Sequence, residues 1–115
     1  MSEFIFLFRG GDYANQSPEE AQAHMQKWFE WMGSLREQGK FVGAQPLTKE
    51  GKQVKGNKKI VTDGPYVEGK EIVGGYLICT ASSFDEAIGI SKGCPILEYE
   101  NGIVEVREIQ QLPAM

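Results

Sequence analysis

Two side chains of this sequence are candidates for acid–base chemistry, and the first is His24. It is the only histidine among the 115 residues, and imidazole is the side chain whose unperturbed pKa lies near neutrality. In a helix that begins at Pro18 and stops before Gly39, the helical period places His24 beside Trp28 and Trp31 at the border of the core. His24 is therefore either a general acid or base, or a packed histidine with a purely structural role.

The second candidate is Asp63, which opens the turn sequence Asp63-Gly64-Pro65-Tyr66. Its carboxylate could orient an imidazole and stabilise the charged form, as the aspartate of a catalytic triad does. It could equally bond its own backbone, as aspartate often does in turns. Tyr13, Tyr66 and Arg107 carry polar tips on large side chains and are candidates for the rim of a substrate pocket.

Motifs for nucleotide binding and zinc hydrolysis are missing from the sequence. There is no GxGxxG, GxxxxGK[ST] or HExxH pattern, so nucleotide-binding and zinc-hydrolase functions are not expected. Cys79 and Cys94 form no CxxC pair and have one histidine to complete a metal site, so we expect no metal and two reduced core thiols. The chemistry predicted is proton transfer on a small organic molecule without a bound cofactor.

The charge distribution limits which macromolecules the protein is expected to bind. The net charge of −4 argues against generic nucleic-acid binding, but residues 49–59 hold five lysines and one glutamate, a local +4. This segment is either an anion or nucleic-acid contact, or a solvated hairpin whose lysines discourage edge pairing. The second interpretation is favoured because no aromatic residue interleaves the lysines. With no membrane span and no signal peptide expected, the predicted location is the cytoplasm.

The elements that position these residues follow from periodicity and caps. Ser17, Pro18 and Glu20 form an N-terminal signature for the first helix, whose apolar stripe is Ala21, Met25, Trp28, Met32 and Leu35. Ser83 and Glu86 cap a second, shorter helix that ends at Gly93-Cys94-Pro95. Strands are predicted at 4–9, 41–47, 59–62, 72–81 and 103–110, with 51–57 as part of a hairpin arm.

This order predicts an α+β fold, the ferredoxin-like βαββαβ plan with an inserted hairpin arm, in a single domain over residues 1–115. Strands 4–9 and 72–81 are apolar on both faces and are therefore expected in the middle of the sheet. Because both helices of this plan lie on one side, a bare face of roughly 400 Å² remains, near the limit for a soluble monomer. The sequence thus predicts a homodimer that closes this face.

The segments 61–66 and 70–78, together with 4–9, 85–87, 94–95 and 104–107, make the chain resemble the YCII-related, DGPF-motif family over nearly its whole length. Tyr66 stands where the motif has phenylalanine. The resemblance implies a dimeric α/β barrel built from two ferredoxin-like protomers. In the wider YCII-related group a histidine and an aspartate lining a cleft have been proposed as an active site. The motif matches Asp63 to that aspartate, and the resemblance leaves His24, outside the motif, as the candidate for that histidine.

Two functions from different classes remain open. The first is a small-molecule enzyme in which His24 transfers a proton, Asp63 orients it in a dimer cleft, and Trp28 and Trp31 wall that cleft. The alternative is a non-catalytic ligand-binding or regulatory module, associated with transcription, in which the lysine-rich arm makes the contact and His24 is dispensable.

Overall fold

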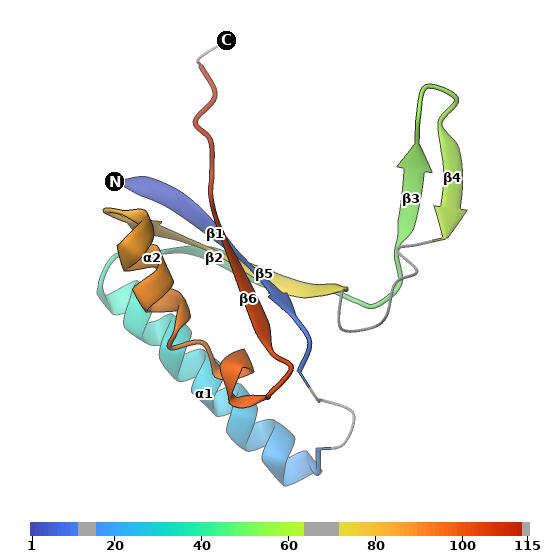
Figure 1. Cartoon of the computed structure of the whole chain (residues 1–115). Helices are drawn as coiled ribbons and strands as arrows, with labels where there is room; N and C mark the ends of the chain where they lie inside the picture. Colours follow the sequence, from blue (N-terminus) through green and yellow to red (C-terminus); the bar gives the residue numbers. More distant parts are fainter. Residues whose placement is uncertain (12–15, 64–71, 114–115) are drawn as a thin grey trace.

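The computed structural model describes residues 1–11, 16–63 and 72–113. Figure 1 shows its elements in chain order: β1 (Ser2–Arg9), α1 (Pro18–Glu37), β2 (Phe41–Pro46), β3 (Lys52–Lys55), β4 (Ile60–Asp63), β5 (Val73–Ala81), α2 (Phe84–Ser91), the 3₁₀ helix η3 (Pro95–Glu98) and β6 (Ile103–Glu108). The predicted ferredoxin-like α+β fold with an inserted arm is confirmed.

The main sheet has the strand order β2-β5-β1-β6, and each neighbouring pair is antiparallel. The two strands that are apolar on both faces, β1 and β5, occupy the centre as predicted, with Ile5 opposite Ile78. The edge positions fall to β2 and β6. Pro46 ends β2, and an edge strand tolerates the missing N–H there.

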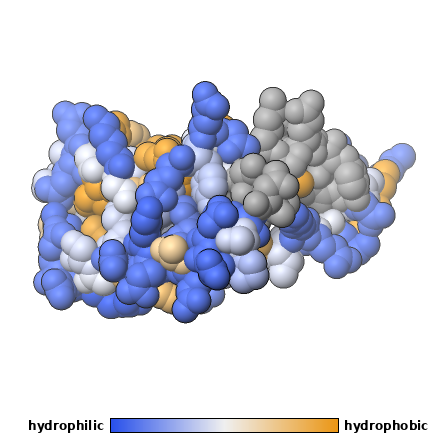
Figure 2. Space-filling view, turned by 90° about the horizontal axis from the view of Figure 1, so that it is seen from below, coloured by the Kyte–Doolittle hydropathy of each residue, from blue (hydrophilic) through white to orange (hydrophobic). Residues whose placement is uncertain are grey.

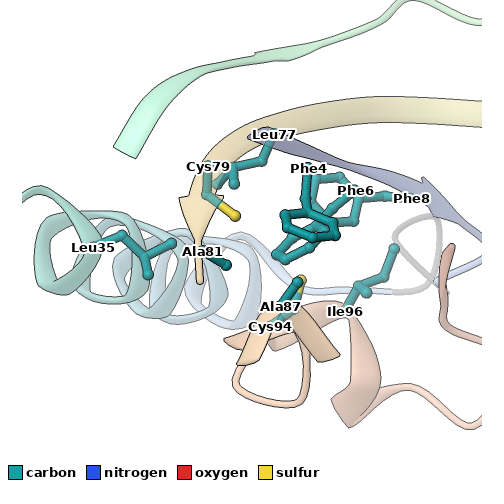
Figure 3. Packing of buried hydrophobic residues seen from close by; sticks show 10 residues of the cluster. All are labelled: Phe4, Phe6, Phe8, Leu35, Leu77, Cys79, Ala81, Ala87, Cys94 and Ile96. Carbon is teal, nitrogen blue, oxygen red and sulfur yellow. The ribbon is translucent and has the colours of Figure 1, made fainter. Parts of the chain in front are cut away.

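The core lies between one face of this sheet and the two helices. Phe4, Phe6 and Phe8 of β1 are buried on that face. The Phe4 ring packs edge-on against Phe84 of α2, with 5.5 Å between centroids, and Phe6 stacks on Trp31 of α1 at 6.2 Å. Figure 3 shows these phenyl rings grouped between β5 and the buried side chains of the α2–η3 segment. Both helices therefore cover the same face of the sheet.

The predicted N-terminal caps are present. The Ser17 hydroxyl accepts a hydrogen bond from the Glu20 amide at 3.1 Å, and Ser83 does the same for Glu86. The predicted apolar stripe of α1 is wrong in its first half, because Ala21 and Met25 are exposed. Figure 1 shows the N-terminal turns of α1 extending past the ends of the strands, and Met25 lines an open pocket there and not the packed core.

The inserted arm is a separate two-stranded sheet of β3 and β4. All of its strand residues are exposed, as the solvated-hairpin interpretation predicts, and its turn uses positive φ angles at Gly56 and Lys59. Figure 1 shows the arm projecting from the end of the main sheet. Figure 2 shows hydrophobic surface on the arm among hydrophilic side chains, and the exposed apolar residues of its strands are Val54, Ile60 and Val61.

Candidate functional site

His24 is buried where α1 packs against Glu98 and Tyr99 at the end of η3, with 7% of its surface exposed. Its Nδ1 lies 3.3 Å from a carboxylate oxygen, Oε2 of Glu98. The imidazole also packs against Tyr99, with 4.9 Å between ring centroids, and against Trp28 at 6.3 Å. The histidine is thus enclosed by two aromatic rings and held at one nitrogen by a carboxylate.

Glu98 is itself fixed by Lys27, whose Nζ lies 2.7 Å from Oε1. The hydrogen bond and the positive charge of Lys27, with a smaller contribution from His24, lower the pKa of the Glu98 carboxyl although partial burial opposes the shift. Glu98 is therefore ionised at neutral pH. A carboxylate at Nδ1 favours the tautomer with its proton on that nitrogen, which leaves Nε2 as the basic atom. That Nε2 is buried.

The segment that carries Glu98 is held in place by two glycines. A Cβ on Gly102 would lie 1.9 Å from the carbonyl oxygen of Ile96, and a Cβ on Gly10 would lie 2.0 Å from that of Asn101. Only glycine, which has no Cβ, allows these backbone segments to lie so close to each other. These close approaches bring the chain after η3 against the end of β1, where the Gly11 amide donates to Oδ1 of Asn101 at 3.2 Å.

Glu98 was not predicted from the sequence. Its bond to Lys27 spans 71 positions, and η3 was not predicted either. Two features of the sequence could have indicated η3 and its carboxylate. Pro95 follows the end of α2 and suits the first position of a new helical turn, and the acidic residues Glu98 and Glu100 come soon after it.

The predicted partner, Asp63, lies elsewhere in the protomer. It ends β4, and its carboxylate oxygen lies 2.6 Å from Nζ of Lys52 across the arm. Figure 1 shows β4 on the projecting arm, well separated from α1. Within one chain the structure therefore does not bring Asp63 to His24.

The remaining predicted site residues divide among several places. Tyr13 and Tyr66 lie outside the described residues. Arg107 is exposed on β6, paired opposite Ile5, and so belongs to the sheet face that the helices leave uncovered. Trp28 and Trp31 pack edge-on at 5.8 Å, but they border different hollows: Trp28 lines a pocket between α1 and the sheet, and Trp31 lines a hollow with Lys27 and Glu98 beside η3.

The pocket between α1 and the β2–β5 side of the sheet has a volume of about 490 Å³, within the usual range for small-molecule sites. Gly74 and Gly75, which follow Val73 at the start of β5, line this pocket. A Cβ on Gly75 would lie 3.1 Å from the carbonyl oxygen of Gln45 and 3.3 Å from Cα of Pro46. The described lining is mainly apolar: Phe8, Gly10, Met25, Trp28, Phe29, Met32, Arg36, Phe41, Ala44, Gln45, Pro46, Gly74, Gly75, Tyr76, Leu77 and Ile96.

Comparison with known families agrees with this architecture, because the model of the YCII-related domain matches residues 5–113. The chain belongs to the YCII-related family. Among solved structures it is similar to 5-chloro-2-hydroxyhydroquinone dehydrochlorinase (TftG) from Burkholderia phenoliruptrix AC1100 in complex with 2,5-dihydroxybenzoquinone, with a TM-score of 0.47 and 16% identity over 96% of this chain and 94% of that chain. No curated protein matches it.

The two thiols of this YCII-related protein are buried and free, as predicted. Burial raises the pKa of Cys79 to about 11, with a smaller effect from Glu86, and raises the pKa of Cys94 to about 12. Neither is a thiolate at neutral pH, so neither is a nucleophile in this state. Over residues 1–11, 16–63 and 72–113, no group of three metal-ligating side chains is present, and no helix is long and apolar enough to cross a membrane.

Proposed function

We propose that this YCII-related protein is a small-molecule enzyme that binds an organic substrate in the pocket beside α1 and transfers a proton with His24, without a cofactor. The observation that carries the proposal is the position of Trp28. Its indole lines the pocket and packs edge-on against the His24 imidazole. The single histidine of the sequence thus lies directly behind the pocket wall.

The contact between His24 and Glu98 supports acid–base chemistry. A carboxylate at Nδ1 orients the ring and stabilises the imidazolium that forms when Nε2 accepts a proton. Since Nε2 is buried, transfer to a substrate in the pocket requires a rotation of the Trp28 side chain or one intervening water. Within a protomer, Glu98 therefore takes the orienting role that the sequence assigned to Asp63.

We also propose that the protein is a homodimer. The second face of the central strands carries half-buried apolar side chains, among them Ile5, Leu7 and Ile78, and both helices pack on the opposite face. Light scattering should return twice the chain mass of 12.8 kDa, and Ile78→Glu should return the monomer mass. In this assembly Asp63 would join the site only if the arm of one copy reaches the His24 of the other.

A turnover assay tests the proposal. Organic acids, lactones and enols are screened for a spectral change, and the variants are then compared on the substrate found. His24→Ala should lower kcat/KM by about 10²- to 10⁴-fold, Glu98→Gln by less, and Lys58→Ala on the arm not at all. Unchanged turnover in His24→Ala would refute the catalytic role. A loss in Asp63→Asn as large as that in His24→Ala would place the arm in the site.

The second candidate function is a non-catalytic ligand-binding or regulatory module, and the burial of Nε2 favours it. Here the pocket holds a ligand, and His24 packs the helix against η3. Such a protein would keep its ligand affinity in His24→Ala, show no turnover in the screen, and melt at a higher temperature when the ligand is present. The two free buried thiols support a reducing, cytoplasmic location for either function.

A further inference from the structure

The chemical character of the pocket beside α1 points to a class of ligand. Its described lining is aliphatic and aromatic, and Arg36 is the one charged side chain among those lining residues. A charged group at the wall of an apolar pocket fixes the orientation of a ligand and selects for its charge. We infer that the pocket accepts an organic anion, with a flat apolar body along α1 and a carboxylate or similar group at Arg36. This inference rests on the pocket proposed above.

The geometry of Arg36 suits this role. Its Cζ lies 4.4 Å from the centroid of the Phe41 ring, so the guanidinium is held over an aromatic face of β2. Among the described residues it forms no ion pair with an aspartate or glutamate, whereas Arg9 pairs with Glu105 and Lys40 with Glu86. Stacking leaves the N–H edge of a guanidinium available, and that edge binds a carboxylate in bidentate fashion.

The distance along α1 sets the size of the ligand. Trp28 and Arg36 both line the pocket, and eight helical residues separate them by about 12 Å along the axis. Long side chains on a helix incline toward its N-terminus, and because this applies to both residues the spacing between the indole and the guanidinium stays close to this axial distance. Two fused aromatic rings with one carboxylate therefore fit better than a single ring. With the carboxylate at Arg36, the far ring lies at Trp28, next to the wall that covers His24.

Isothermal titration calorimetry with matched probes tests the inference. The probes are 2-naphthoate and its neutral counterpart 2-naphthalenemethanol, titrated into the full chain. Wild type should bind the carboxylate about 10-fold more tightly than the alcohol, as a charge-assisted hydrogen bond at a partly exposed site allows. Arg36→Met, which keeps the aliphatic contact, should bind the two probes equally. Lys58→Met removes the same charge from the distant arm and should keep the wild-type preference.

The outcomes separate this inference from the function on which it rests. Equal affinity of wild type for the two probes, or a preference that survives in Arg36→Met, overturns the anion selectivity while the pocket itself stands. An equal loss of preference in Lys58→Met overturns it as well, because the effect would then come from net charge. Binding of neither probe removes the pocket function and the selectivity together. Matching melting curves establish that each variant is folded.

Discussion

Replacing Gly10 with alanine tests whether the end of β1 really locks the segment that carries Glu98. Gly10 has a φ of +77°, and a Cβ there would lie 2.0 Å from the carbonyl oxygen of Asn101. Gly39 is a natural control, because its φ of +72° is nearly the same but nothing lies within 4 Å of its Cβ position. Gly10→Ala and Gly39→Ala therefore impose the same left-handed backbone strain on alanine, and only Gly10→Ala adds a clash with the Asn101 carbonyl.

The expected magnitudes follow from this difference. A side chain in the left-handed region costs roughly 1–2 kcal/mol, and Gly39→Ala should lose about that much stability. Gly10→Ala must also displace a backbone carbonyl by more than an ångström, which disturbs the bond from the Gly11 amide to Asn101, worth roughly 0.5–1.5 kcal/mol. We therefore expect a total loss of about 1.5–3.5 kcal/mol for Gly10→Ala.

Urea unfolding followed by far-ultraviolet circular dichroism measures both losses in one experiment, provided that the slopes with denaturant agree among the variants. Gly56→Ala adds a second control, because its φ is +69°, no atom lies within 4 Å of its Cβ position, and it lies in the arm. If Gly10→Ala costs no more than Gly39→Ala, the close packing of β1 against Asn101 does not contribute to the folded state as argued.

Three further predictions concern the core and the ionisable groups. Phe6→Ala removes a fully buried ring and should cost about 3–5 kcal/mol in urea unfolding; a loss below 1 kcal/mol would contradict the packing described. Since the pKa values of Cys79 and Cys94 are raised to about 11 and about 12, Ellman's reagent at about pH 8 should label neither thiol in the native protein and both in concentrated guanidinium. Lys27 lowers the pKa of Glu98, so this carboxylate stabilises the fold at neutral pH, and the contribution disappears as the pH falls through the ordinary glutamate range near about 4.3 and below it. The midpoints of wild type and Glu98→Gln should converge between roughly pH 5 and pH 3, and parallel curves would show that the pairing contributes nothing.

Local patterns in the sequence were enough to predict most of the fold. The two strands that are apolar on both faces could be placed at the centre of the sheet, because such a strand is stable only where both of its faces can be covered. Ile5 of β1 and Ile78 of β5 do pair there. The caps at Ser17 and Ser83 depend on neighbouring residues alone. The arm was recognisable by its glycines and by the scarcity of strand-forming residues.

The candidate site was predicted less well because it depends on contacts between distant segments. His24 could be placed at the core border from helical spacing, but its carboxylate partner comes from η3, and no local pattern links the two. Asp63 was paired with His24 on chemical grounds, and topology placed it on the arm beside Lys52. The exposed Ala21 and Met25 show the same limit, because periodicity gives the face of a helix but not where the sheet beneath it ends.

The attachment of the arm makes it a separable part of the domain. Pro46, the last residue of β2, pairs with Gly75 near the start of β5, so the chain leaves the sheet and returns to it at one place. Closing this gap with a short turn would cost little, since loop entropy changes slowly with length. The stretch between these residues can therefore be shortened or exchanged by design, while the scaffold that holds His24 stays intact.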